Sequence, residues 1–188
     1  MIKSKKELRE YLDCELKRYN CGKMKYIFQI GEAAILRKYI TLLRKTEYYV
    51  NTSKKIRALI YKIKFAKISN QYLMHIPINS CDKGLKIMHL GPILMNSKTK
   101  CGKNVVIHIN TSFVAGGRNH DAPVIGDDVI VGVGAVVVGG VRIANKVAIG
   151  ANAVVNKDVV EENIAVAGVP AKKISNNGSA TWNPKNQK

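Results

Sequence analysis

Residues 125–159 read IGDDVIVGVGAVVVGGVRIANKVAIGANAVVNKDV, and this stretch decides the fold. Every sixth position holds a β-branched aliphatic residue: Ile125, Val131, Val137, Ile143, Ile149 and Val155. The position four further on is small or β-branched in every set: Val129, Ala135, Val141, Val147, Ala153 and Val159. A period of six suits neither an amphipathic helix nor a lone strand. Self-similarity at a fixed period instead predicts a solenoid, in which each repeat buries its apolar face on its neighbours.

Each hexad is expected to be one short strand plus a turn, so that three hexads close one triangular coil with the leading aliphatic inside. The turns at 126–128, 144–146 and 150–152 are rich in Gly, Asn and Asp, which tolerate positive φ. The same frame extends backward, imperfectly, to about residue 77. Residues 115–123 break it and contain two glycines and an exit proline, so we expect a loop that leaves one corner of the coil.

Residues 1–75 are predicted to be α-helical. Ser4 and Glu7 form a capping box, and a helical pattern follows it. A second helix is expected at about 30–46, and a third at about 54–70 with Ile56, Leu59, Ile60 and Ile63 on one face. These helices should cap the open end of the solenoid, with basic outer faces that are also candidates for contact with an acceptor or a membrane. The solenoid is expected over 76–174 and a flexible tail over 175–188, whose composition is polar.

The chain has 188 residues and a net charge of +18, of which +12 falls in residues 1–75 (18 Lys and Arg against 6 Asp and Glu). Such a charge favours anionic partners, but no nucleic-acid motif is present, so we expect no nucleic-acid partner. The four cysteines have neither metal nor redox spacing, and we expect no metal. No segment reads as a signal peptide or membrane span. We expect the cysteines to be buried or idle thiols in a reducing cytosol.

The order of these parts resembles the hexapeptide-repeat acyltransferases, and most closely their serine acetyltransferase branch. The matching motifs are GLKIMH at 84–89, GGR at 116–118, PVIGDDV at 123–129, IGANAVV at 149–155, KDV at 157–159 and AGVPAK at 167–172. The segment LRKTEY at 43–48 is also similar to the helical region of bacterial members. The resemblance implies a left-handed parallel β-helix, a cytoplasmic homotrimer with active sites between subunits, and acetyl transfer from acetyl-CoA to a hydroxyl or amine.

The reaction requires a base, because the acceptor hydroxyl must lose its proton as it attacks the thioester, and histidine suits that task near neutral pH. By the resemblance, His89 is the catalytic base. His120, in the loop, is a second catalytic candidate, either as a contact to the acceptor or as an alternative base. His108 and His75 are expected to be structural, although His108 could also line the cleft.

The resemblance also assigns binding residues. Ala151, Gly132 and Val133 should line the groove for the pantetheine arm of acetyl-CoA, and Asn156 and Lys157 should lie near its thiol and phosphates. Lys172 is expected at the nucleotide end. The loop residues Arg118, Asn119 and Asp121 are the expected contacts to the acceptor.

The sequence departs from the serine acetyltransferase pattern at two acidic positions, which are Met74 and Met88 here. These changes touch the groups that orient the base and hold serine, while the acetyl-CoA side is intact. We therefore expect an O-acetyltransferase for a sugar hydroxyl in surface polysaccharide synthesis, with serine O-acetylation as the alternative. Asp82 and Asp121 are candidates to orient His89. An N-acetyltransferase for an amino sugar and a scaffold without catalysis are further alternatives.

Overall fold

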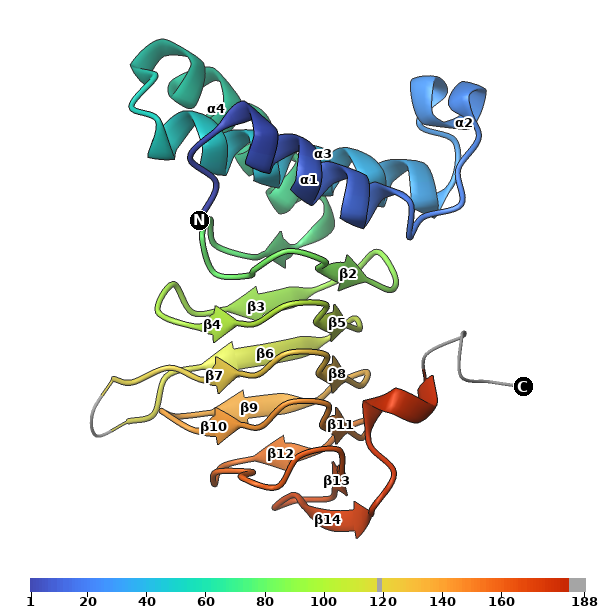
Figure 1. Cartoon of the computed structure of the whole chain (residues 1–188), viewed down its shortest axis with the longest axis vertical. Coiled ribbons are helices and arrows are strands. Elements are labelled where there is room, and N and C mark those ends of the chain that lie inside the picture. The colour runs from blue at the N-terminus through green and yellow to red at the C-terminus, as the bar shows by residue number, and fades with distance from the viewer. Residues whose placement is uncertain (118–119, 183–188) are drawn as a thin grey trace.

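The computed structural model describes residues 1–117 and 120–182, and it consists of a helical end followed by a stack of three-sided coils (Figure 1). The helices are α1 (Lys5–Leu16), α2 (Lys23–Phe28), α3 (Glu32–Asn51) and α4 (Lys55–Tyr72). The first six strands are β1 (Met74–His75), β2 (Lys86–Ile87), β3 (Ile93–Met95), β4 (Lys100–Cys101), β5 (Val106–Ile107) and β6 (Thr111–Val114). The next six are β7 (Val124–Ile125), β8 (Ile130–Val131), β9 (Val136–Val138), β10 (Arg142–Ile143), β11 (Ala148–Ile149) and β12 (Val154–Val155). The chain then forms β13 (Ala165–Ala167), β14 (Lys172–Ser175) and the short 3₁₀ helix η1 (Ser179–Trp182).

The strands form three sheets, one on each side of a left-handed parallel β-helix, as predicted. Their orders are β1-β3-β6-β9-β12, β4-β7-β10 and β2-β5-β8-β11-β13-β14. Ile125 pairs with Ile143, which is 143 − 125 = 18 residues or three hexads later. Phe113 pairs with Val137, a step of 137 − 113 = 24, because the loop at 115–123 adds residues to that coil. The strand pairing therefore shows that the hexad is the structural unit and that the loop is an insertion at one corner of the coil.

The leading aliphatic residues point into the coil, as the six-residue period predicted. Those from Ile125 to Val155 are at most 3% exposed. Positive φ occurs at the third turn residue, at Asp128, Lys146 and Asn152. Gly132 serves a different purpose: a Cβ there would lie 2.8 Å from the backbone nitrogen of Ala151 in the next coil. This glycine is needed because successive turns approach closely rather than because of its own φ.

The coil ends in an antiparallel hairpin, in which β13 pairs with β14. The following segment, expected to begin a flexible tail, returns to the coils as far as residue 182. Ser179 is buried there, with its Oγ donating to the carbonyl of Asp128 and its backbone N–H donating to the carbonyl of Lys146. The expectation for residues 183–188 falls outside the described part of the chain.

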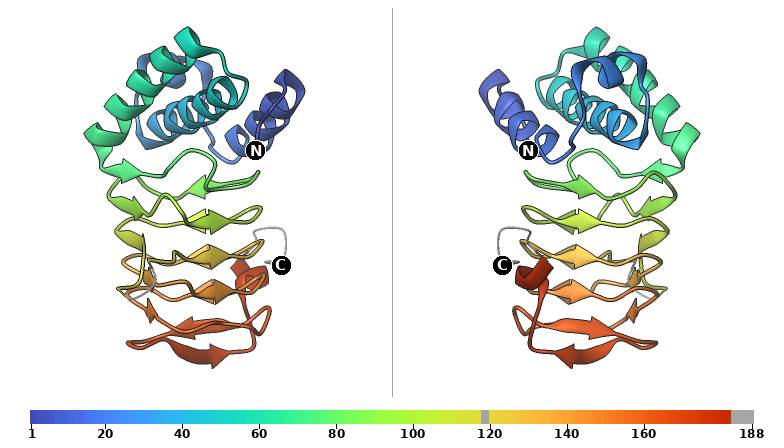
Figure 2. Two further views of the ribbon diagram at one scale, coloured as in Figure 1. Left: turned by 90° about the vertical axis from the view of Figure 1, so that its left-hand side faces the viewer. Right: turned by 90° about the vertical axis from the view of Figure 1, so that its right-hand side faces the viewer.

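The helical end begins with the predicted capping box, in which Ser4 and Glu7 satisfy each other's backbone N–H groups. Helix α4 forms where the periodicity predicted a helix. The side chains expected on one of its faces, Ile56, Leu59, Ile60 and Ile63, face solvent and are 44–78% exposed. Phe65, Ile68 and Tyr72 pack inward instead, with the Phe65 ring 5.2 Å from that of Tyr39 on α3. Figure 2 shows α4 running along the outside of the helical end. Among the described residues, the helices lack the length and apolar content that a membrane crossing requires.

A buried ionic cluster joins the helical end to the first coil. Arg44 on α3 is fully buried and pairs with Glu15 at 2.6 Å and Glu47 at 2.9 Å. Its guanidinium also donates to the carbonyls of Cys81 (2.8 Å) and Asp82 (2.9 Å), and Glu15 accepts the backbone N–H groups of residues 84 and 85. Burial disfavours the charged guanidinium, but the two carboxylates outweigh that effect and raise the pKa of Arg44. The motif at 43–48 therefore has a structural role, which is to fix the helices to the coils.

Candidate active site

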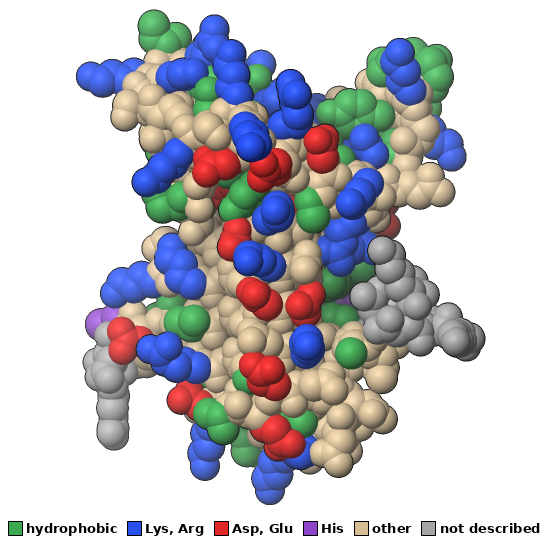
Figure 3. All heavy atoms as spheres, viewed as in Figure 1, with side chains coloured by type: hydrophobic (Ala, Val, Ile, Leu, Met, Phe, Trp, Pro, Cys, Tyr) green, Lys and Arg blue, Asp and Glu red, His purple; other side chains and the backbone are tan. Residues whose placement is uncertain are grey.

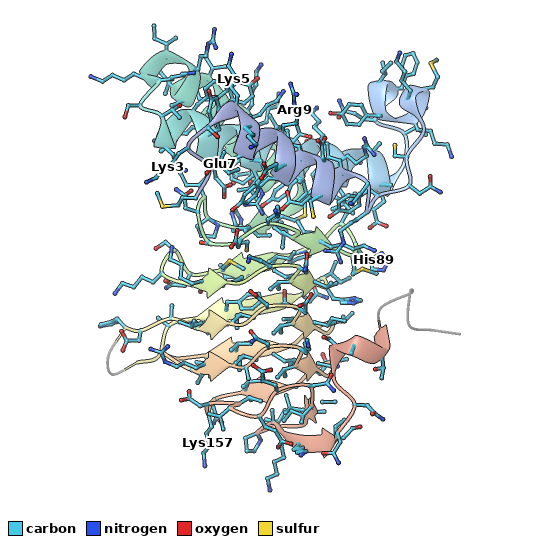
Figure 4. The ribbon with its side chains drawn as sticks, in the orientation of Figure 1. Lys3, Lys5, Glu7, Arg9, His89 and Lys157 are labelled. Atoms are coloured by element: carbon cyan, nitrogen blue, oxygen red, sulfur yellow. The ribbon has the colours of Figure 1, made fainter. Side chains whose placement is uncertain are left out.

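His89 lies at the corner where the β2 sheet turns into the β3 sheet, just below the helices (Figure 4). The strands before this corner are in register, with Ile87, Ile107, Val131, Ile149 and Val166 paired from coil to coil. The residues that follow them therefore stack along one edge of the solenoid, here named the His89 corner: His89, His108, Gly132, Val133, Gly150 and Ala151. The imidazole of His89 is 53% exposed, so a substrate can reach it.

Glu32 reaches His89 from the helical end. It is the first residue of α3 and follows Gly31, whose φ of 86° starts the helix at this point. One carboxylate oxygen lies 3.2 Å from Nδ1 of His89, and the other accepts the backbone N–H of Leu90 at 2.5 Å. A carboxylate at Nδ1 favours the tautomer with its proton there and leaves Nε2 free to accept one. The pair has the arrangement of a general base with its orienting group.

His108 stands one coil below His89, with ring centroids 6.3 Å apart. Within the described chain its Nδ1 is buried and makes no hydrogen bond. Burial lowers the pKa of His108, and the neighbouring His89 and Lys86 lower it further. A neutral imidazole at His108 places no positive charge beside His89 at neutral pH. His108 therefore lines the His89 corner, whereas His75 is exposed on β1, where it pairs with Leu94 on β3.

The loop that carries His120 leaves a different corner, between β6 and β7, on the opposite side of the molecule from His89 (Figures 1 and 4). His120 is exposed, has φ of 52°, and accepts a hydrogen bond from Lys98 at its backbone carbonyl. Asp121 is exposed as well, and its carbonyl accepts the N–H of Gly116. The predicted contacts Arg118 and Asn119 lie outside the described residues. His89 and His120 therefore do not meet within one chain.

The predicted acetyl-CoA contacts divide between the same two corners. Gly132, Val133 and Ala151 stack below His89, and Lys172 pairs with Ala167 at the far end of that corner. Asn156 and Lys157 instead follow β12, on the side of the coil from which the His120 loop leaves (Figure 4). Only the first group shares a corner with the proposed base.

Neither aspartate considered as the orienting group contacts His89 among the described residues. Asp82 accepts hydrogen bonds from the Tyr11 hydroxyl and the Lys83 N–H, and Asp121 lies in the distant loop. Met74 is buried and Met88 half-buried. Sequence reasoning missed Glu32, which lies 57 residues before His89. Its only signal was an acidic residue in the first turn of a helix, which ordinarily indicates no more than a favourable interaction with the helix dipole.

No family model matches the sequence. A serine acetyltransferase from Mycobacterium tuberculosis is 34% identical over 102 residues, or 52% of this chain. The chain matches only 43% of that relative's length.

Solved serine acetyltransferases have the same fold. One from Neisseria gonorrhoeae superposes with a TM-score of 0.72 at 20% identity, over 98% of this chain and 73% of that one. A Neisseria gonorrhoeae enzyme in complex with serine gives 0.70 at 21% identity, over 92% and 71%. One from Brucella abortus in complex with coenzyme A gives 0.68 at 21% identity, over 92% and 68%. The expected resemblance to the hexapeptide-repeat acyltransferases, and to their serine acetyltransferase branch, is therefore confirmed in both sequence and fold.

Proposed function

We propose that the chain is an acetyl-CoA-dependent O-acetyltransferase in which His89 is the general base and Glu32 positions it. The observation that carries this proposal is the Glu32 carboxylate, which lies 3.2 Å from Nδ1 of His89 and also accepts the Leu90 N–H. This two-point contact fixes the imidazole against the backbone and leaves Nε2 open. An oriented histidine at an accessible corner suits proton abstraction from a hydroxyl.

The reaction follows from this arrangement. The acceptor hydroxyl oxygen attacks the thioester carbonyl while Nε2 of His89 takes its proton. The new carbon–oxygen bond forms, the carbon–sulfur bond breaks, and coenzyme A leaves as the thiol after receiving the proton from His89. Glu32 supports the imidazolium that exists between these two proton transfers, because a carboxylate beside a positive ring stabilises it.

Serine is the acceptor that the similar proteins favour. The relative from Mycobacterium tuberculosis is a serine acetyltransferase, and one similar structure holds serine. The sugar acceptor expected from the sequence has no support from these proteins. That expectation began with the loss of carboxylates at Met74 and Met88. Glu32 supplies a carboxylate to the base, so the missing acidic residues no longer leave His89 without an orienting group. Only their expected role in holding serine still speaks against a serine acceptor.

A homotrimer would complete the site. His89 lies at one corner and His120, Asn156 and Lys157 lie on the opposite side of the same chain, so a shared site requires the two corners of neighbouring copies. The groove between copies would hold coenzyme A, with the close-packed turns at Gly132 and Ala151 on one wall. The similar structure in complex with coenzyme A supports this donor.

The test is release of free thiol from acetyl-CoA in the presence and absence of L-serine, with nucleotide sugars and oligosaccharides as parallel acceptors. We expect L-serine to stimulate release, and His89→Ala to reduce the stimulated rate by about 10²- to 10⁴-fold. His75→Ala, on the outer face of β1, is the matched control and should keep the rate. Equal rates for wild type and His89→Ala on every acceptor would refute the proposal and favour a scaffold without catalysis.

A further inference from the structure

Helix α4 carries two apolar faces, and only one of them is packed. Ile56, Leu59, Ile60 and Ile63 recur at three- and four-residue spacing, so they lie on one side of the helix. They are 44–78% exposed, whereas Phe65, Ile68 and Tyr72 on the other side pack inward. A contiguous aliphatic stripe that is left in solvent marks an interaction surface.

A second exposed apolar group lies on and beside α2. Its members are Met24, Ile27, Phe28 and Ile30, each 55–65% exposed. Both groups lie at the end of the molecule opposite the closing hairpin (Figure 1). Figure 3 shows hydrophobic side chains at the two upper corners of the molecule, over the start of α4 and over α2, with Lys and Arg around them. The two groups form separate points of contact on one end.

The charge of these segments has a single sign. Residues 22–30 and 54–72 contain eight Lys and Arg and no Asp or Glu. By helical spacing, Lys55 and Lys62 flank the α4 stripe on one side, and Arg57 and Lys64 flank it on the other. An aliphatic stripe between two basic rows is the pattern of a helix that lies in the interface of an anionic membrane.

A groove between α3 and α4, lined also by Tyr26 and Gln29 on and beside α2, could hold a lipid headgroup. Its volume is about 480 Å³. Four lysines line it, Lys38, Lys45, Lys64 and Lys67, together with Tyr61 and other uncharged side chains. No carboxylate is among the described residues that line the groove, so its lysine charges are not balanced by them.

We propose that this end of the molecule, with the α4 stripe, the α2 group and the lysine groove, docks on an anionic phospholipid membrane. The aliphatic side chains would enter the headgroup boundary and the lysines would contact lipid phosphates. A second copy of the chain is a poorer occupant, because a symmetric contact would bring two carboxylate-free basic surfaces together. A nucleic acid is also poorer, because bulky aliphatic side chains give it nothing to stack on.

Vesicle co-sedimentation of the full chain tests this inference without acetyl-CoA, so it is independent of the proposed reaction. Wild type should bind phosphatidylcholine vesicles that contain phosphatidylglycerol. It should not bind vesicles of phosphatidylcholine alone, and high salt should abolish its binding to the anionic vesicles. Leu59→Gln with Ile63→Gln should weaken binding at least tenfold. Lys64→Gln with Lys67→Gln should weaken it about 25-fold, from roughly fivefold per lysine.

Matched controls lie on the coils. Ile174→Gln, exposed on β14, and Lys103→Gln with Lys146→Gln, in exposed turns, should bind like wild type. Absence of binding to anionic vesicles would overturn the inference, as would stripe variants that bind as tightly as wild type. If soluble glycerol phosphate fully displaces the protein from anionic vesicles and the stripe variants bind as wild type does, the surface is a phosphate site rather than a membrane-docking surface. If wild type does not bind vesicles and light scattering shows a lower oligomeric mass for the stripe variants, the stripe instead makes contacts between copies of the chain.

Discussion

In the proposed reaction Glu32 orients His89, and this role can be separated from a structural one. We expect Glu32→Gln to lower kcat about 10- to 100-fold with little change in KM, because an amide can still touch Leu90 but cannot support an imidazolium. Steady-state kinetics with acetyl-CoA and the active acceptor measures both constants. Glu10→Gln, an exposed carboxylate on α1, is the control. A Glu32→Gln enzyme that keeps the wild-type kcat would show that the carboxylate does not serve the base.

His108 should make stability depend on pH below neutrality. Its pKa is lowered in the folded state, first by burial and then by His89 and Lys86. The unfolded chain therefore binds more protons at this side chain, and the free energy of unfolding falls as the pH drops through the ordinary histidine range. Above that range both states are neutral and the residue has no effect.

Urea denaturation from pH 7.5 down to pH 5 checks this prediction. His108→Gln should lose less stability over that interval than wild type, and His75→Gln should behave like wild type. Parallel curves for wild type and His108→Gln would contradict the assignment.

The sequence points to His89 as a candidate base but not to Glu32 beside it, and the reason is distance along the chain. The motif around residues 84–89 has a local spacing that a sequence displays directly. Glu32 belongs to another element, and only the docking of α3 on the first coil brings its carboxylate to the imidazole. No local pattern encodes such a contact, so the aspartates near the motif appeared to be better candidates.

Arg44 is the main polar link between α3 and the coils, and its loss should be costly. Arg44→Ala would leave Glu15 and Glu47 buried without a cation, and we expect the free energy of unfolding to fall by about 3–5 kcal/mol. Chemical denaturation measures the change, with Arg9→Ala on the exposed side of α1 as the control. If Arg44→Ala proves as stable as Arg9→Ala, the ionic cluster does not hold the junction.

The coils were predictable from sequence because each hexad repeats one environment, so inner and turn positions recur in a countable frame. The packing of the helical end was less predictable from the sequence. The positions of α3 and α4 followed from periodicity, but α4 has apolar residues on both sides, and periodicity alone could not tell which side packs. The ring of Phe65 against Tyr39 decides this in the structure.

In the whole molecule, the central feature is that the predicted site residues are divided between two corners. His89, Glu32 and the turns at Gly132 and Ala151 lie on one edge of the solenoid. The loop with His120, together with Asn156 and Lys157, lies on the other side. The sequence supplied both sets of residues, but their separation became visible only when the strands were assigned to sheets.

The most direct test of this account is complementation between inactive subunits. His89→Ala and His120→Ala are each expected to be strongly impaired alone. The two variants are unfolded together in equal amounts and refolded, so that mixed trimers form. The His89 corner at a given site is intact with a chance of one half, and so is the loop of the neighbouring subunit. About a quarter of the sites should therefore combine an intact corner with an intact loop. Thiol release from acetyl-CoA should then recover to about a quarter of the wild-type rate. A mixture no more active than its separate components, or a His120→Ala protein with full activity, would contradict a site shared between subunits.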